Sequence, residues 1–269
     1  MGWDEKVYLE EVAVEELGFI WWPDITFPNE EQARIRENAA LILYENGTAE
    51  YEERFGVTLE ADYDLRQFPF DQQTLRIEIE SLAWSEAYLQ FHADDAKIGF
   101  REDFAIPEWE VIDVRTHLED VQEIRDGEPF SEFVMEIDVR RQPGFYIWKV
   151  FVPLTLIVML SWSVFWTLEE TLTSSLTISF TGILTVVAYQ FVLGDALPRI
   201  SYITFLDAVL LFAFALMAAT IAENIIVHDL KDRNRNAAKT IERVSRVAFP
   251  LTYIVVIVAL LFIYGIVAL

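Results

Sequence analysis

The 269-residue chain contains no cysteine. This absence excludes disulfides, zinc–thiolate centres and cysteine nucleophiles, and it disfavours a eukaryotic extracellular domain, which usually relies on disulfides. The 3 histidines, His92, His117 and His228, are far apart in the sequence and show no metal-ligand spacing. A nucleophile–base pair and a glycine-rich phosphate loop are also missing. The sequence thus predicts no enzyme, no cofactor and no metal site, and it raises the hypothesis that histidines and carboxylates sense pH.

Basic residues are scarce in the first half of the chain. Residues 1–143 contain 12 Lys+Arg and 36 Asp+Glu, whereas residues 144–269 contain 8 of each, so the first half carries the whole net charge of −24. This asymmetry predicts two modules in different surroundings, residues 1–143 and residues 144–269. A negative field argues against nucleic acid as a partner and concentrates cations. The start, "MGWDEKVYLEE", has no signal-peptide pattern, so an exported acidic module implies a processed form or a fragment.

Long apolar runs are confined to the second half. The four runs lie at about 145–166, 172–194, 203–227 and 249–269, and each is long enough to span ~30 Å of hydrocarbon at ~1.5 Å per residue. The link between the last two is basic, with Lys231, Arg233, Arg235, Lys239, Arg243 and Arg246. By the positive-inside rule this link is cytoplasmic, and the acidic module is extracellular or periplasmic. The sequence therefore predicts a multi-pass cell-membrane protein whose helices contact lipid.

The acidic module shows the alternation of β-strands. In "LRIEIES", Leu75, Ile77 and Ile79 share one face and the charged residues share the other. The run "FVMEIDVRR" alternates similarly, and "ALILYENGTAEYEERF" indicates two strands joined by a tight turn at Asn46-Gly47. Alternation with one wet face predicts an antiparallel sandwich. We therefore expect an all-β immunoglobulin-like sandwich, with a short helix near Glu10–Leu17, followed by an all-α four-helix transmembrane domain.

The second apolar run carries a stripe of hydroxyl groups. On a helix with about 100° per residue, a set of residues falls within about 40° of one line: Glu170, Thr173, Thr177, Thr181, Leu184, Ala188, Phe191 and Asp195. One interpretation is ordinary, because Ser and Thr in membrane helices bond the carbonyl of the preceding turn or pack against neighbours, as we expect for Ser175 and Ser179. The alternative follows from the order of residues, since acids at both ends of a stripe mark a water path.

One such helix cannot enclose a pore, but several copies around an axis can. The three threonines of the stripe would then offer oxygens to a partly dehydrated ion, and Leu184 and Phe191 would form apolar constrictions that close by dewetting. Asp195 would form an acidic ring at the outer mouth, with Glu170 near the inner one, and both favour cations over anions. The pattern predicts a cation channel whose pore is lined by this helix.

Six segments in register resemble the pentameric ligand-gated ion channels, the Cys-loop receptor superfamily. They are "WWPDI" (21–25), "DLRQFPFDQQ" (64–73), "RRQPGFYIWKVFVPL" (140–154), "SWSVFW" (161–166), "LTVVAYQF" (184–191) and "LPR" (197–199). The second segment looks like the family's signature loop. The cysteines that flank that loop in animal members would fall at Ala61 and Leu75, and neither is Cys. This is the pattern of the family's prokaryotic branch, and the resemblance runs from about residue 3 to the C-terminus.

The resemblance implies a ten-strand extracellular sandwich and a homopentamer of this chain with four identical neighbours. The acidic residues of the stripe and of the first module predict monovalent cations as the permeant ions. The resemblance further implies a site for a small-molecule agonist between neighbouring sandwiches. The residues implied are Ile25, Thr26, Phe27, Glu80, Leu82, Trp84, His117 and Phe130 on one subunit, and Tyr51, Glu52 and Arg54 on its neighbour. Aromatic rings with carboxylates suit an ammonium ligand. The plainer alternative is that the rings are sandwich core and the acids are solvated.

The resemblance also implies residues that couple the two modules during gating. They are Phe68, Pro69, Phe70 and Asp71 of the signature loop, Arg141 before the first membrane helix, and Pro198 and Arg199 of the outer loop. We expect Asp71 and Arg141 to meet as a partly buried ion pair, which can serve structure, coupling or both.

The chain departs from the family pattern in three ways. The family normally begins with two further strands, and we expect them to be missing from this chain. Many cation channels of the family carry Glu just inside the pore mouth, where this chain has Thr173 and Ser174. At the position where the family has an agonist-binding aromatic residue, in the loop after the signature loop, this chain has Leu82. Trp84 is the expected replacement. The main alternative to a channel is a membrane-anchored extracellular binding protein without a conducting pore, which would need no ordered stripe.

Overall fold

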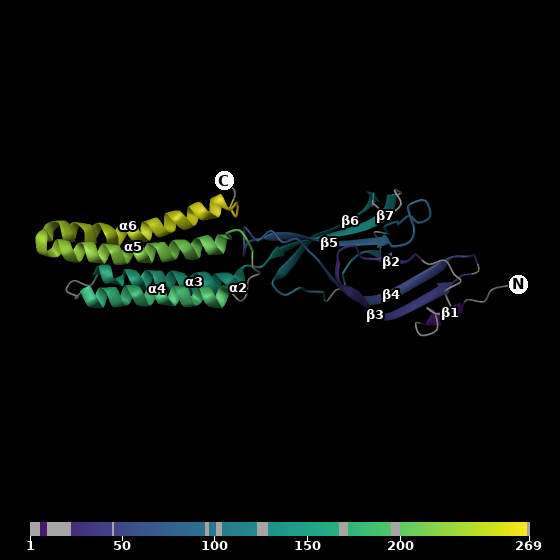
Figure 1. Cartoon of the computed structure of the whole chain (residues 1–269), viewed down its shortest axis with the longest axis horizontal. Coiled ribbons are helices and arrows are strands. Elements are labelled where there is room, and N and C mark those ends of the chain that lie inside the picture. The colour runs from purple at the N-terminus through teal and green to yellow at the C-terminus, as the bar shows by residue number, and fades with distance from the viewer. Residues whose placement is uncertain are drawn as a thin grey trace. The chain divides into compact units, whose positions relative to one another are not determined.

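The computed structural model describes residues 6–9, 23–44, 46–94, 97–100, 104–122, 129–166, 172–194 and 200–267. The chain divides into two compact units (Figure 1). The first holds Met1–Tyr63, Gln73–Ala105 and Val111–Val139, and the second holds Asp64–Gln72, Ile106–Glu110 and Arg140–Leu269. The signature loop therefore belongs to the same unit as the helices. The short helix expected near Glu10–Leu17 lies outside the described residues.

The first unit contains a three-stranded antiparallel sheet in the order β1-β3-β4. Its strands are β1 (Lys6–Leu9), β3 (Glu30–Leu43) and β4 (Ala49–Leu59). The expected hairpin joins β3 to β4, and the Tyr44 N–H closes the turn by donating to Thr48 O at 2.8 Å. Gly47 adopts a φ of +85°, a left-handed conformation that costs glycine little. The Asn-Gly signal in the sequence is thus confirmed as a tight turn.

The first unit also contains most of a four-stranded sheet in the order β2-β5-β7-β6. Its strands are β2 (Ile25–Thr26), β5 (Gln72–Ser81), β7 (Pro129–Arg141) and β6 (Trp109–Gln122). The alternation on β5 does not produce a fully wet face. Leu75, Ile77 and Ile79 are half-buried, and Glu80 on the opposite face is buried. Arg76 and Glu78, on the same face as Glu80, are partly buried and line the cavity described below.

The second unit is a helical bundle joined to the signature loop. Along the chain it comprises α2 (Gly144–Tyr146), a π-helical turn (Ile147–Phe151), α3 (Val152–Ser161), a 3-10 turn (Trp162–Trp166), α4 (Leu172–Gly194), α5 (Phe205–Arg233) and α6 (Arg235–Ile263). In this bundle α5 packs against both α4 and α6, and α3 packs against α4. Leu154, Val186, Leu206 and Met217 are completely buried between these helices.

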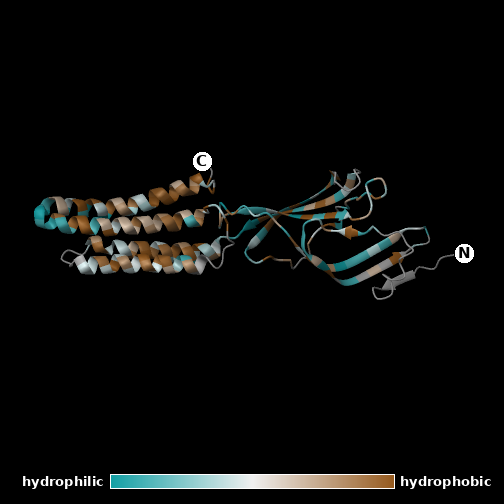
Figure 2. Cartoon of the chain, in the orientation of Figure 1, coloured by the Kyte–Doolittle hydropathy of each residue, from teal (hydrophilic) through white to brown (hydrophobic). Residues whose placement is uncertain are grey.

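The helices are long and apolar enough to cross a membrane in four places. The spans are Gly144–Trp166, Thr173–Phe191, Phe205–Arg233 and Arg235–Ile263, and Figure 2 shows apolar residues in brown along all of them. The outer side of α6 exposes Leu251, Ile254 and Val258. An extended apolar surface of this kind marks contact with another apolar phase, here the lipid tails.

The last two helices extend further than hydropathy alone indicates. Only Asn234 separates α5 from α6, because it serves both helices: its N–H donates to Leu230 O at 2.7 Å and its Oδ1 accepts from the Ala237 N–H at 3.1 Å. Lys231 and Glu242 join the two helices through a 3.0 Å ion pair. The basic link is therefore helical, and it forms the hydrophilic turn of the bundle in Figure 2.

Candidate functional site

Asp71 and Arg141 form a buried ion pair in the second unit. The side chain of Asp71 is 1% exposed and that of Arg141 is 11% exposed. The guanidinium reaches both carboxylate oxygens, with Nε 2.8 Å from Oδ1 and Nη2 3.3 Å from Oδ2. The Arg141 N–H also donates to Asp71 O at 3.0 Å. A buried, bidentate ion pair fixes the orientation of both side chains. It therefore anchors the signature loop to the start of the bundle.

Aromatic rings and a second carboxylate surround the Arg141 guanidinium. Its Cζ lies 4.1 Å from the ring centroid of Trp109 and 4.8 Å from that of Phe68, within the range of cation–π contact. Its Nη1 lies 3.7 Å from Glu108 Oε2. Sequence reasoning missed Glu108 and Trp109, and nothing in their local sequence marks them, because they reach Arg141 only through the fold.

The signature loop packs its aromatic side chains into the helical bundle. Phe68 is buried with its ring edge-on to Tyr146 at a centroid distance of 4.7 Å. Phe70 lies 5.8 Å from the ring of Phe205 at the start of α5. Pro69, which lies between Phe68 and Phe70 in the chain, is buried and follows a cis peptide bond. Phe68 and Phe70 of this loop therefore contact the helical bundle, and Asp71 contacts Arg141 just before the bundle begins.

The segment before α5 is tied to the same loop by hydrogen bonds. The Leu65 N–H donates to Tyr202 Oη at 2.9 Å, and the Phe205 N–H donates to Arg66 O at 2.8 Å. The Arg66 guanidinium lies 5.2 Å from the Tyr202 ring centroid. Sequence reasoning missed Tyr202. Pro198 and Arg199, which it named, lie outside the described residues.

The stripe on α4 lies on the exposed side of that helix. Leu184 and Phe191 are 67% and 75% exposed, and Thr173, Thr177, Thr181 and Ala188 are exposed as well. The other side of α4 is buried in the bundle through Ser179 and Val186. Packing within one subunit therefore leaves the stripe uncovered. Glu170 and Asp195, at its two ends, lie outside the described residues.

The stripe threonines donate their hydroxyl hydrogens to their own helix. Thr177 Oγ1 donates to Thr173 O and Thr181 Oγ1 donates to Thr177 O, each at 2.8 Å. Hydrogen bonds of this kind, to the carbonyl of the preceding turn, are what the ordinary interpretation of Ser and Thr in a membrane helix predicts. It has a chemical consequence, because a hydroxyl that donates to its own helix presents oxygen lone pairs to its surroundings. Ser179, off the stripe, is buried and accepts a 3.4 Å hydrogen bond from Asn224 Nδ2.

The first two agonist-site segments lie side by side in the four-stranded sheet. Ile25 pairs with Ser81 and Thr26 pairs with Glu80 across β2 and β5. Phe27, the next residue, is buried, and its ring lies 5.2 Å from that of Phe55. Phe27 therefore matches the plainer expectation of a core residue. Glu80, only 2% exposed, is not the solvated acid that the same alternative expects.

The aromatic residues around this segment differ in exposure. Leu82 is 53% exposed, whereas Trp84 is half-buried and packs on Tyr88 at a ring distance of 6.1 Å. Phe130 on β7 is buried, and His117 on β6 is partly buried. Of the two expected aromatic residues, Trp84 is therefore more accessible than Phe130.

The residues expected on the neighbour's face lie on β4, in the other sheet. Tyr51 Oη donates to Glu53 Oε2 at 2.8 Å, and Arg54 Nε lies 3.1 Å from Glu37 Oε2. Glu52 is exposed. A single subunit therefore does not bring this set together with Glu80 in one sheet.

A charged cluster crosses the four-stranded sheet at Glu132. Arg76 on β5 reaches Glu78 on the same strand at 3.2 Å and Glu119 on β6 at 3.3 Å. The pKa of Glu119 is lowered, chiefly because His117 Nε2 hydrogen-bonds its carboxylate at 2.7 Å. Glu132 lies on the central strand, β7, and is 6% exposed. Burial, with the neighbouring carboxylates, raises the pKa of Glu132 to about 7. Sequence reasoning missed this residue.

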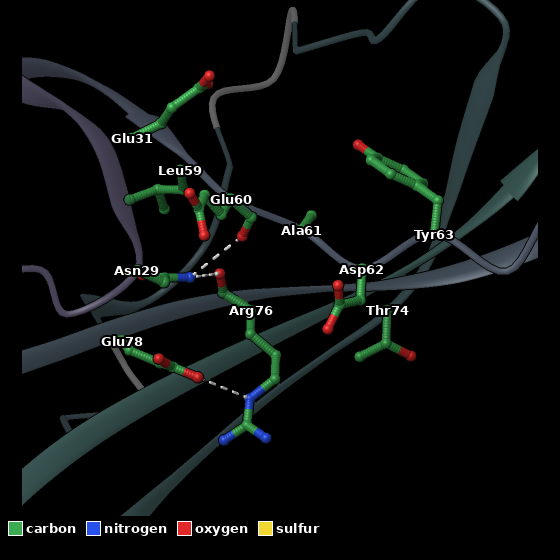
Figure 3. A pocket seen from close by; sticks show the side chains of 10 residues that line it. All are labelled: Asn29, Glu31, Leu59, Glu60, Ala61, Asp62, Tyr63, Thr74, Arg76 and Glu78. Atoms are coloured by element: carbon green, nitrogen blue, oxygen red, sulfur yellow. Dashed lines mark hydrogen bonds and ion pairs between the residues drawn. The ribbon is translucent and has the colours of Figure 1, made fainter. Parts of the chain in front are cut away.

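A cavity in the first unit is lined largely by charged and polar side chains (Figure 3). Its volume is about 670 Å³. It is bordered by Asn29, Glu31, Leu59, Glu60, Ala61, Asp62, Tyr63, Thr74, Arg76 and Glu78. Asn29 Nδ2 donates to Arg76 O at 2.9 Å and so ties one wall to the other. Within the described ranges, no group of three or more His, Asp or Glu is arranged to hold a metal ion.

Comparisons with known proteins match both modules. Residues 1–143 match the neurotransmitter-gated ion-channel ligand binding domain, and residues 150–251 match the neurotransmitter-gated ion-channel transmembrane region. A proton-gated ion channel of Gloeobacter violaceus is 25% identical over 246 residues, which cover 91% of this chain and 68% of that protein. A gamma-aminobutyric acid receptor subunit beta of Lymnaea stagnalis is 28% identical over 215 residues, which cover 78% of this chain and 43% of that protein.

A second subunit beta of a gamma-aminobutyric acid receptor, from Caenorhabditis elegans, is 28% identical over 85% of this chain and 42% of its own length. The chain thus spans about two thirds of the Gloeobacter channel but less than half of the receptor subunits it matches. The two family matches together cover most of the sequence, in the order in which the structure places a β-sheet domain before four apolar helices. The chain belongs to the pentameric ligand-gated ion-channel family, as a multi-pass membrane protein with an extracellular ligand-binding domain.

Proposed function

We propose that five copies of this chain form a cation-selective channel, and that the exposed side of α4 lines its pore. The observation that carries the proposal is the uncovered stripe, which holds hydroxyl groups in its first half and large apolar side chains in its second. A helix side that faced only lipid would have no need for a row of exposed hydroxyl groups. Around a symmetry axis, the same stripe becomes a series of rings.

Three features favour cations. The threonine oxygens present lone pairs, because their hydrogens are donated along the helix. Acidic residues stand at both ends of the stripe in the sequence, Glu170 and Asp195. The ligand-binding domain carries the whole net charge of −24, which raises the local concentration of cations. Leu184 and Phe191 are the apolar positions at which the pore would dewet and close.

The opening signal acts on the ligand-binding domain, as a small extracellular ligand, a change of pH, or both. Its relatives include a protein named as proton-gated and others named as receptors for gamma-aminobutyric acid. In this chain, Glu80 and Trp84 combine a buried carboxylate with an accessible ring. That pairing suits an ammonium group through charge and cation–π contact. Tyr51, Glu52 and Arg54 would complete the site from the neighbouring subunit.

The absence of native cysteine makes a direct test possible. Single cysteines are placed at Thr181 and Leu184 on the stripe, at the buried Val186, and at Leu251 on the lipid-facing side of α6. The channel in proteoliposomes is then treated with a charged thiol reagent that works only in water. We expect labelling at the two stripe positions alone. Labelling of none of them, or of Leu251 as readily as Leu184, would contradict a water-filled pore lined by α4.

A further inference from the structure

The central strand of the four-stranded sheet carries a buried acid between acids on both neighbouring strands. β7 lies between β5 and β6, and Glu132 on β7 is buried. Glu78 and Glu80 on β5 and Glu119 on β6 all act on it with like charge. An ionised carboxylate at this position is disfavoured twice, by loss of water and by repulsion.

The positive charge in this cluster is already shared. Arg76 lowers the pKa of Glu132, but less than burial and the three neighbouring glutamates raise it. The same guanidinium is within 3.3 Å of both Glu78 and Glu119. His117 on β6 is hydrogen-bonded to Glu119 at 2.7 Å. Arg76 therefore offsets only part of the repulsion that Glu132 experiences from the three neighbouring carboxylates, and binding a proton at Glu132 removes that repulsion.

The remaining acids nearby belong to other interactions. Glu136, further along β7, lies 3.2 Å from Arg115, which also holds Asp138 at 2.6 Å. In the loop after β5, Glu86 accepts a 3.3 Å hydrogen bond from Gln90. The Glu86 N–H donates to Pro129 O at 2.9 Å, so this loop is packed on the start of β7. Unlike Glu136 and Glu86, Glu132 combines burial with like charge on both neighbouring strands.

We propose that Glu132 is a proton-binding site of the ligand-binding domain, and that proton uptake there stabilises the packing of β7 between β5 and β6. Glu132 changes its protonation state near neutral pH, since burial and like charge raise its pKa to about 7. Its effect on opening rests on the function proposed above, whereas its protonation does not. The strand that carries Glu132 continues to Arg141 and its buried ion pair, so β7 is the segment through which we expect the effect to reach the bundle.

The sign of the effect follows from linkage. A carboxyl whose pKa is higher in the folded state than in the unfolded chain binds its proton more tightly when folded. The resulting stability is complete below the unfolded pKa of about 4.5 and is lost as the pH rises through about 7. Between pH 8 and pH 6, proton uptake should shift the folding equilibrium toward the folded state about tenfold.

Infrared spectroscopy tests the protonation without any ligand. The intact purified channel is taken from pH 8 to pH 6, and the carbonyl stretch of protonated carboxyl groups is measured in the wild type, Glu132→Gln and Glu136→Gln. The matched control Glu136→Gln removes an acid from the same strand that is already paired with Arg115. We expect the wild type and the control to gain a band that Glu132→Gln lacks. An unchanged band in Glu132→Gln, or no band in any of the three, would overturn the proposal.

A second pair of variants tests the origin of the shift. Glu78→Gln removes a repelling charge and should move the midpoint of the Glu132 titration to lower pH. Arg76→Gln removes the attracting charge and should move it to higher pH. Equal midpoints in the wild type and Glu78→Gln would show that the neighbouring acids do not act on Glu132. These spectra are recorded without ion flow, so a failure of the proposed channel function would be detected separately, as an absence of current.

Discussion

Replacing Asp71 by Asn should destabilise the chain far more than the same change at an exposed ion pair. Asp71 is 1% exposed, and both of its oxygens hold the Arg141 guanidinium at 2.8 and 3.3 Å. Asparagine has nearly the same size and keeps one acceptor oxygen, but it removes the negative charge. The guanidinium would then remain between the rings of Phe68 and Trp109 without its counter-charge.

The expected cost is about 3–5 kcal/mol, the range found when one partner of a buried pair is removed. Glu108 reduces it only partly, because its carboxylate is 3.7 Å from Arg141 and about half exposed. The matched control is Asp64→Asn in the same loop, where Asp64 and Arg66 pair at 2.9 Å with both side chains more than half exposed. Such a pair contributes about 0–1 kcal/mol.

Unfolding of the purified channel in detergent, followed by tryptophan fluorescence, measures both variants, and Trp109 next to Arg141 is one of the reporters. The difference between Asp71→Asn and Asp64→Asn should persist at high salt, since a buried pair is screened much less than an exposed one. If Asp71→Asn costs no more than Asp64→Asn, the ion pair does not anchor the signature loop to the bundle.

Three further changes test separate parts of the structure. Tyr202→Phe should cost about 1–2 kcal/mol of unfolding free energy, because the Leu65 N–H loses its 2.9 Å acceptor; thermal unfolding would show no change if the bond is unimportant. Thr204→Ala should cost about 1 kcal/mol, because α5 loses the capping box that Thr204 forms with Asp207, and Thr204→Ser should recover most of it. Glu132→Gln should remove about 3 kcal/mol of stability change between pH 4 and pH 8; parallel pH profiles for variant and wild type would contradict this.

Local patterns predicted much of the fold. The Asn46-Gly47 turn and the four spans could be located from the sequence because each rests on neighbouring residues alone. The ends of α5 and α6 were predicted less well, since the helices continue through polar sequence. Asn234 caps both of them, and Lys231–Glu242 pairs across them. Hydropathy measures where a helix is apolar and not where it ends.

The sites depend more on tertiary structure. Asp71 and Arg141 are 70 residues apart, so only a family resemblance could indicate that they meet. Trp109 and Tyr202, which complete the same region, have no local signal. Glu132 was missed for a different reason. In a strand with alternating residues, an acid is expected to face solvent, and its burial becomes visible only when β7 is placed between β5 and β6.

The stripe on α4 is a case in which both interpretations of the sequence hold in part. Its threonines do bond the preceding turn, as ordinary membrane helices do. They nevertheless lie on the uncovered side of the helix, together with Leu184 and Phe191. Local bonding and a role in the pore are therefore compatible, because the first uses the hydroxyl hydrogen and the second uses the oxygen.

The reversal potential of a leaking pore variant tests the central proposal most directly. Leu184→Ala, made in the complete gene where an upstream segment exists, should weaken the apolar constriction and let water and ions pass at rest. Cells that express it are voltage-clamped across a sodium gradient, with surface expression confirmed. A standing current that reverses near the sodium potential is the result expected for a cation channel gated at Leu184. A current that reverses near the chloride potential would contradict the charge argument, and no current from protein at the surface would contradict a pore along α4.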